Sequence, residues 1–131
     1  GTSVVSDIVL RALYVDKYGK PAPVRKAGAD RYATAQIVNQ YGVDYLIGTD
    51  PDGVFVATGT NYPDALAGGV IAGIGGAQWR PLMLTKPTAL SGATKSFISA
   101  NESIQFFSIL GGTSAVSSAV ESELSAAVQA N

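Results

Sequence analysis

Three cationic side chains and an aromatic ring lie close together near the start of the sequence. Arg25, Lys26 and Arg31 can attract phosphate or carboxylate groups, and the ring of Tyr32 can stack on a sugar. Together they predict a site for an anionic polymer or a phosphate group. A purely structural interpretation stays open, in which Asp30 caps a helix, Arg31 pairs with a neighbouring carboxylate and Tyr32 packs against its surroundings.

A second group of polar residues occurs in the segment ATGTNYPDALAGG, from Ala57 to Gly69. The Asn61 amide and the Asp64 carboxylate can satisfy free backbone N–H groups in the first turn of a helix, and both are candidates for ligand binding. An enzyme would instead use Asp64 as a general base, paired with Asp30. No distance between these two carboxylates follows from the sequence, so both hypotheses stay open.

The composition of the chain excludes several kinds of chemistry. The 131 residues include no His and no Cys, which rules out a Ser-His-Asp triad, a Cys-His pair, a disulfide and an imidazole or thiolate metal site. Neither G-x-G-x-x-G after a strand nor G-x-x-x-x-G-K-[ST] occurs, so we expect no cofactor and no metal. The net charge is -1, which argues against nucleic acid as a partner, and no apolar run is long enough to insert into a membrane.

Alternating strand and helix patterns must position these residues. Strand patterns cover four segments, of which the first is short and weak: Val24–Ala27, Gly53–Thr58, Pro81–Thr85 and Ile104–Leu110. Helical patterns begin near Asp30, Asn61, Ser91 and Ser114. This alternation predicts an α/β fold, a Rossmann-like three-layer domain with a four-stranded, mainly parallel sheet. Because ligands bind beyond the carboxyl ends of such strands, we expect the three cations to lie together at that edge.

The first residues of the chain are repeated near its end. Residues 1–13, GTSVVSDIVLRAL, match residues 112–124, GTSAVSSAVESEL, at seven of thirteen positions. The match predicts the C-terminal helix of a preceding repeat at residues 1–13, a linker at 14–23, and one complete repeat at 24–131, excised from a tandem array. The apolar stripe of the first helix, Val5, Ile8 and Val9, would then pack on a second surface of its own domain or on a neighbouring molecule. The alternative is two unrelated amphipathic helices with similar caps.

Four segments, in this order and at these spacings, resemble the cell wall binding repeat 2 family: AGADRYATA, VATGTNYPDALAGG, the apolar strand before Lys86-Pro87, and ILGGTSAVSSAVESEL. The resemblance covers about Val24 to Leu124. These repeats occur in tandem in surface-layer proteins, amidases and other cell-wall proteins of Gram-positive bacteria. The resemblance implies a Rossmann-like or toprim-like α/β unit, with three such units around a pseudo-threefold axis.

The same resemblance implies a non-catalytic module that holds its protein non-covalently on an anionic cell-wall polymer. The Arg-Tyr pair of the family maps to Arg31 and Tyr32, and its Asn/Pro/Asp turn maps to Asn61, Pro63 and Asp64. Its Ile-Leu-Leu-like triplet maps to residues 82–84, which read Leu-Met-Leu, so the Met departs from the pattern.

The expected partners are an anionic cell-wall polysaccharide and either neighbouring repeats or a homo-trimer. We expect no nucleic acid and no membrane insertion, and a secreted location at the cell wall or cell surface. Two alternatives stay open. One is an α/β enzyme or a nucleotide- or phosphate-binding domain that uses Asp30 and Asp64, and the other is a structural spacer between binding repeats.

Overall fold

The computed structural model describes residues 5–12, 24–47, 50–74 and 79–131. Its centre is a parallel sheet of three strands in the order β2-β1-β3. The strands are β1 (Gly53–Thr58), β2 (Leu82–Thr85) and β3 (Phe106–Leu110). In the register of the sheet, Phe55 of β1 lies opposite Leu82 on one side and Ser108 on the other. The mixed α/β class with a parallel sheet is therefore confirmed.

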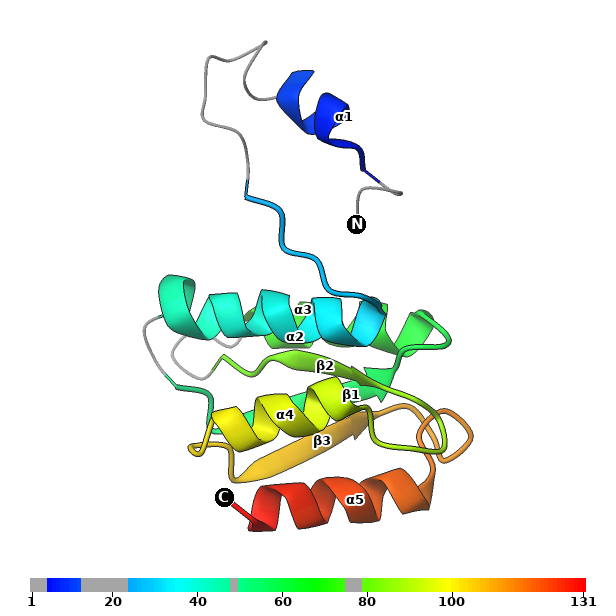
Figure 1. Cartoon of the computed structure of the whole chain (residues 1–131). Coiled ribbons are helices and arrows are strands. Elements are labelled where there is room, and N and C mark those ends of the chain that lie inside the picture. Colours follow the sequence, from blue (N-terminus) through cyan, green and yellow to red (C-terminus); the bar gives the residue numbers. More distant parts are fainter. Residues whose placement is uncertain (1–4, 13–23, 48–49, 75–78) are drawn as a thin grey trace.

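Helices cover both faces of this sheet (Figure 1). The helices of the domain are α2 (Arg31–Tyr41), α3 (Pro63–Ile74), α4 (Gly92–Ala100) and α5 (Ser118–Gln129). One face is covered by α3, and the other is covered by α4 and α5, with α2 packed beside α4 and against β2. The result is the expected arrangement of three layers.

The prediction of a fourth strand is wrong. The segment Val24–Ala27 forms no strand, and Val24 is 76% exposed. The outer edge of β2 has its carbonyl groups satisfied by side chains instead. The Leu82 carbonyl accepts a hydrogen bond from the Asn39 amide at 2.8 Å, and the Leu84 carbonyl accepts one from Thr94 Oγ1 at 2.7 Å. Because α2 and α4 supply these donors, the sheet ends at β2 without another strand.

Two helix starts follow directly from capping residues that the sequence predicts. The carboxylate of Asp30 accepts a hydrogen bond from the backbone N–H of Ala33 at 2.8 Å, and α2 begins at the next residue. The hydroxyl of Ser91 accepts one from the N–H of Thr94 at 3.2 Å, and α4 begins after it. Both caps are confirmed. At its other end, α2 continues into a π-helical turn, η2 (Gly42–Ile47).

The last helix begins later than expected. The pattern places its start near Ser114, but α5 begins at Ser118, with Ser117 as its N-cap residue. The preceding residues form a separate turn, in which the N–H groups of Ala115 and Val116 both donate to the carbonyl of Gly112. Gly111 opens this turn with a φ of 108°, a left-handed conformation that favours glycine. The turn delays the helix by four residues and directs Val116 into the core.

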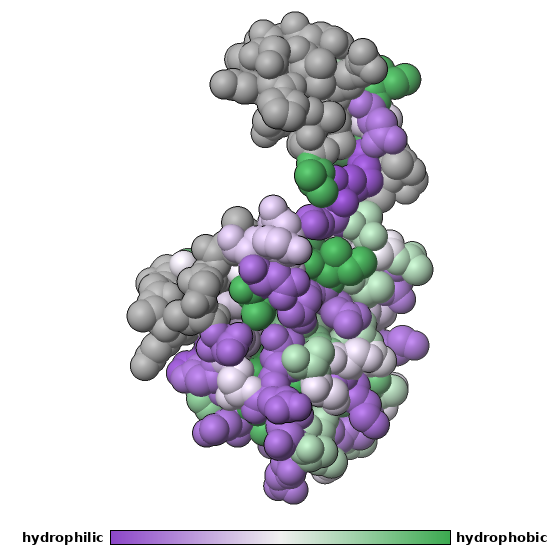
Figure 2. All heavy atoms as spheres, turned by 60° about the vertical axis from the view of Figure 1, so that its left-hand side comes forward, coloured by the Kyte–Doolittle hydropathy of each residue, from purple (hydrophilic) through white to green (hydrophobic). Residues whose placement is uncertain are grey.

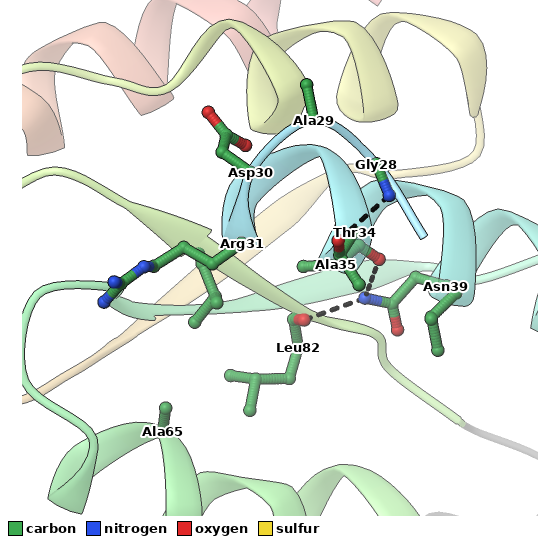
Figure 3. A pocket seen from close by; sticks show the side chains of 11 residues that line it. Gly28, Ala29, Asp30, Arg31, Thr34, Ala35, Asn39, Ala65 and Leu82 are labelled. Carbon is green, nitrogen blue, oxygen red and sulfur yellow. Dashed lines mark hydrogen bonds between the residues drawn. The ribbon is translucent and has the colours of Figure 1, made fainter. Parts of the chain in front are cut away.

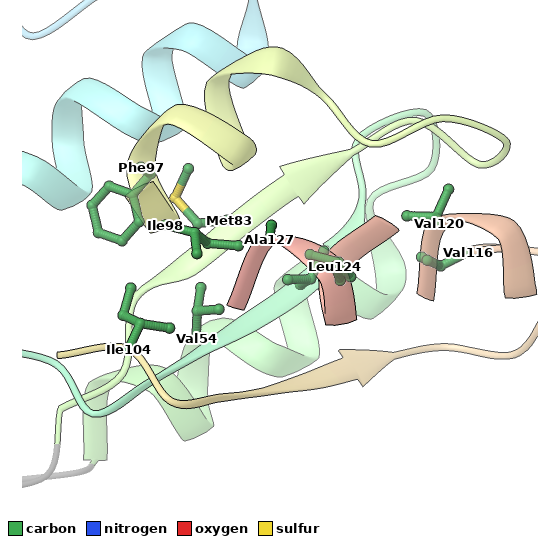
Figure 4. Packing of buried hydrophobic residues seen from close by; sticks show 10 residues of the cluster. Val54, Met83, Phe97, Ile98, Ile104, Val116, Val120, Leu124 and Ala127 are labelled. Atoms are coloured by element: carbon green, nitrogen blue, oxygen red, sulfur yellow. The ribbon is translucent and has the colours of Figure 1, made fainter. Parts of the chain in front are cut away.

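The core lies between the sheet and the helices α4 and α5 (Figure 4). Phe97 and Ile98 of α4 pack with Met83 of β2, and Leu124 of α5 packs with them; all four side chains are fully buried. Met83 is the residue that departs from the family pattern suggested by the resemblance, and its flexible side chain is nevertheless fully buried in the core.

The first helix, α1 (Asp7–Arg11), stands apart from this core (Figure 1). Val116 and Val120, which correspond to Val5 and Val9 in the repeat, are 3% and 0% exposed, whereas Val5 and Val9 are 40% and 47% exposed. The prediction that α1 packs on its own domain is therefore wrong, and burial on a neighbouring molecule stays a prediction. No helix in the described part of the chain is long and apolar enough to cross a membrane.

Candidate functional site

Arg31 and Tyr32 meet the end of β1 at the carboxyl edge of the sheet. The Arg31 guanidinium donates a hydrogen bond to the carbonyl of Gly59, the residue after β1. The ring of Tyr32 lies against the same glycine, because a Cβ atom at residue 59 would be 2.6 Å from Tyr32 Cε1. The Gly59 N–H also donates to the Thr85 carbonyl at 2.8 Å, which ties this corner to β2. A glycine is thus required here for the close approach of the ring.

Asp64 and Asn61 come to the same edge from the turn between β1 and α3. Asp64 lies in the first turn of α3, and its Oδ2 would be 2.5 Å from a Cβ atom at Gly111, which follows β3. Asn61 is exposed in the preceding turn. Neither side chain forms a hydrogen bond to another residue in the described part of the chain, so the predicted capping bonds are not seen. The carboxyl ends of β1 and β3 therefore present Asn61 and Asp64 with unoccupied polar atoms.

Arg25 and Lys26 do not join Arg31 at this edge. Arg25 pairs with Asp7 of α1 at 2.9 Å and also donates to the Val5 carbonyl. Lys26 Nζ lies 3.8 Å from the ring centroid of Tyr41, at the far end of α2. That end is roughly 15 Å from Arg31 at the usual rise per residue. The expected common basic edge is therefore wrong, because the segment before α2 runs along the helix instead of ending at the sheet.

The pairing of Arg25 with Asp7 also neutralises charge locally. In Figure 2, hydrophilic side chains lie in the narrow connection between α1 and the sheet domain. An arginine that holds α1 in this way has less of its charge available for a distant ligand. A role of Arg25 or Lys26 in ligand binding stays a prediction.

The two carboxylates of the enzyme hypothesis have separate surroundings. The Asp30 carboxylate caps α2, whereas Asp64 faces Gly111, and no hydrogen bond links them. Among the residues that the structure describes, no group of three or more acidic side chains is placed to hold a metal ion. Asp30 and Asp64 are therefore not brought together as a pair by any contact in the described residues.

An apolar groove runs along the outer edge of β2, between α2 and α3 (Figure 3). Its volume is about 700 Å³, and Asn39 and Thr34 form its polar side, with Ala65 of α3 opposite. Asp30 and Arg31 line the groove where α2 begins. Its larger apolar lining residues are Val38, Leu82 and Leu84. On the outer side of α3, beside Ala65, Leu66 is 70% exposed and Val70 is 61% exposed. The groove and the exposed side of α3 together form an apolar surface on which another protein segment can pack.

A polar cleft of about 420 Å³ lies between α2 and α4. It is lined by Tyr32 and by three residues that the sequence analysis did not select, Gln36, Lys86 and Ser96. Lys86 directly follows β2. The rule that ligands bind beyond the carboxyl ends of strands could therefore have identified Lys86, whereas Gln36 and Ser96 carry no such signal.

One ion pair at the opposite edge of the sheet is structural. Arg80 Nε donates to Asp52 Oδ1 at 3.0 Å, and the guanidinium stacks 4.4 Å from the ring centroid of Phe106. The hydrogen bond from Arg80 holds the pKa of Asp52 below its ordinary value, and the same bond raises the pKa of Arg80. Both side chains lie at the amino ends of β1 and β2, away from the candidate site.

Comparisons with known proteins agree on one family. The family model described as cell wall binding domain 2 (CWB2) matches residues 25–121. The N-acetylmuramoyl-L-alanine amidase LytC of Bacillus subtilis (strain 168) is 30% identical over 124 residues, which are 95% of this chain and 22% of LytC. The structure of Cwp6 from Clostridium difficile has a similar fold, with a TM-score of 0.67 and 20% identity over 86% of this chain and 18% of that one. The chain thus spans about a fifth of the length of these two proteins.

Proposed function

The chain belongs to the cell wall binding domain 2 family, and from that premise we propose that it is a non-catalytic module that binds an anionic polymer of the cell wall without a covalent bond. The observation that carries the proposal is the family match over residues 25–121, which includes α2, all three strands and the turns after them. The absence of His and Cys supports a non-catalytic role, because the commonest general base and the thiol nucleophile are both missing. A secreted location at the cell wall or cell surface is part of the same proposal.

We assign the contacts with the polymer to the carboxyl edge of the sheet. Support comes from two segments that meet this edge. Arg31 and Tyr32 begin α2 and contact Gly59 after β1, while Asn61 and Asp64 lie where the chain passes from β1 into α3. Arg31 has further N–H groups besides the one that it donates to Gly59, and these can meet a phosphate or a carboxylate. Tyr32 is fixed by its packing on Gly59, so its ring loses little freedom on binding.

We further propose that the module works beside other repeats, either in one longer chain or in a homo-trimer. The groove in Figure 3 and the exposed side of α3 offer an apolar surface, and α1 offers an apolar stripe that its own domain leaves uncovered. Residues 1–13 would then be the last helix of the preceding repeat, residues 14–23 a linker, and residues 24–131 the complete repeat. Residues 1–4 and 13–23 lie outside the described residues. Several weak sites joined in this way bind a repetitive polymer with avidity.

Sedimentation with purified Bacillus subtilis cell walls tests the proposal. Wild-type protein should pellet with the walls, and Arg31→Ala should weaken binding at low salt, where charge contributes most. Lys95→Ala is a matched control, because Lys95 is an exposed cation on α4 outside the site. Walls stripped of their anionic polymers should retain less protein. If a protein that links three copies of the wild-type repeat does not bind intact walls, the proposed function is wrong.

A further inference from the structure

The polar cleft between α2 and α4 is a second surface at the carboxyl edge of the sheet. Its volume of about 420 Å³ is within the range of about 300–1,000 Å³ that small-molecule sites occupy. Lys86 reaches it from the end of β2, Gln36 comes from the second turn of α2, and Ser96 comes from the second turn of α4. Two well-formed helices and a strand end therefore surround it, so the positions of these residues are set by rigid elements.

The polar groups of this cleft are available for a ligand. Gln36, Lys86 and Ser96 form no hydrogen bond or ion pair with any residue within the described ranges, and Lys86 and Ser96 are exposed. By contrast, Ser91, which also lines the cleft, is buried, and its hydroxyl donates to the Leu84 carbonyl at 2.8 Å. The cleft thus combines one hydrogen-bonded serine with three side chains whose polar atoms have no partner among the described residues. These three side chains can exchange hydrogen bonds to water for hydrogen bonds to a ligand at little cost.

The mixture of donors and acceptors indicates which ligand fits. Lys86 can only donate, the Asp30 carboxylate can only accept, and Gln36 and Ser96 can do both. Asp30 Oδ1 already accepts from Ala33, but the second oxygen of the carboxylate stays free. A phosphate or carboxylate would meet the negative charge of Asp30 as well as the positive charge of Lys86. A hydroxyl group both donates and accepts, so neighbouring hydroxyls of a sugar can satisfy the two side chains together.

We propose that this cleft binds one uncharged sugar ring of the wall polymer through its hydroxyl groups, with Gln36, Lys86 and Ser96 as the hydrogen-bonding residues. Tyr32 also lines the cleft, and its packing on Gly59 holds the aromatic ring where the apolar face of a sugar can contact it. The inference rests on the proposed function for the identity of the polymer. It adds that Arg31 contacts a charged group of the polymer while the cleft binds a neutral sugar of the same polymer.

The test compares a tryptophan introduced into this cleft with a tryptophan introduced on another side of the same helix, α4. Ser96→Trp places an indole in the cleft, whereas Ser99→Trp places one on the α5 side of α4, where a different pocket lies. Ser96→Trp should weaken sedimentation with purified Bacillus subtilis walls tenfold or more at both low and high salt, and Ser99→Trp should leave it unchanged. Gln36→Ala should weaken binding about two- to tenfold, as expected for one neutral hydrogen bond. Thermal unfolding checks that each variant folds. If Ser96→Trp does not fold, the binding measured with Gln36→Ala decides the test.

A second measurement uses small probes and does not depend on the walls. In an NMR titration of wild-type protein, a panel of uncharged hexoses and N-acetylhexosamines should shift the side-chain amide signals of Gln36, and inorganic phosphate should not. Wall binding that is normal in both Ser96→Trp and Gln36→Ala would overturn the cleft and leave the proposed function intact. If the linked three-repeat protein fails to bind walls but a sugar shifts the Gln36 signals of the single chain, the wall-binding function is wrong and the cleft stands as a sugar site. If phosphate alone shifts Gln36, or no sugar does, the inference is wrong.

Discussion

Replacement of Gly59 by alanine should disturb the candidate site without removing any of its functional groups. A Cβ atom at residue 59 would be 2.6 Å from Tyr32 Cε1 and 3.3 Å from Arg31 Cδ. The ring has to move by about 0.8 Å to regain an ordinary contact, and the Arg31 side chain has to move with it. Because Gly59 lies in a buried corner beside β1, we expect Gly59→Ala to lower the free energy of unfolding by about 1–3 kcal/mol.

A double-mutant cycle in urea measures whether the ring is the cause. Tyr32→Ala removes the side chain that the new methyl group would meet, so Gly59→Ala should cost at least 1 kcal/mol less in that background. Gly69→Ala is the control, since a Cβ atom at this position of α3 would meet nothing within 4 Å. It should stabilise the helix by up to about 1 kcal/mol. An equal cost of Gly59→Ala with and without the Tyr32 ring would refute the reasoning, because backbone effects would then explain the loss.

Three other substitutions test the ion pair, the core and the apolar surface. Asp52→Asn should flatten the pH dependence of the free energy of unfolding, measured in urea, below about pH 4. The lowered pKa of Asp52 contributes stability that is fully present above the ordinary pKa of 3.8 and is lost as the pH falls through the lowered pKa. Phe97→Ala should lower the free energy of unfolding by about 3–5 kcal/mol, measured in the same way, because this fully buried ring would leave a cavity. Leu66→Ser should reduce self-association in analytical ultracentrifugation while leaving the unfolding temperature nearly unchanged, because Leu66 is 70% exposed.

The local features of this protein could be predicted from its sequence. Asp30 and Ser91 stand immediately before helical patterns, and a cap acts within three residues of itself, so both helix starts were correct. The run GVFVAT is apolar up to its last residue, which is typical of a strand covered on both faces, and it forms the central strand β1. The family also followed from the sequence, because its motifs are contiguous segments whose order and spacing need no structure.

Only the tertiary structure decided where the sheet ends and which residues lie together at the candidate site. Asn39 bonds the Leu82 carbonyl across 43 residues of sequence, and this contact, with those from α4, ends the sheet at three strands. Arg31 reaches Gly59 across 28 residues, while Arg25 turns instead to Asp7. Residue type and spacing show that a side chain is able to bind a ligand. The path of the backbone decides which side chains share a surface, because a hydrogen bond depends on distances that chain neighbours do not determine.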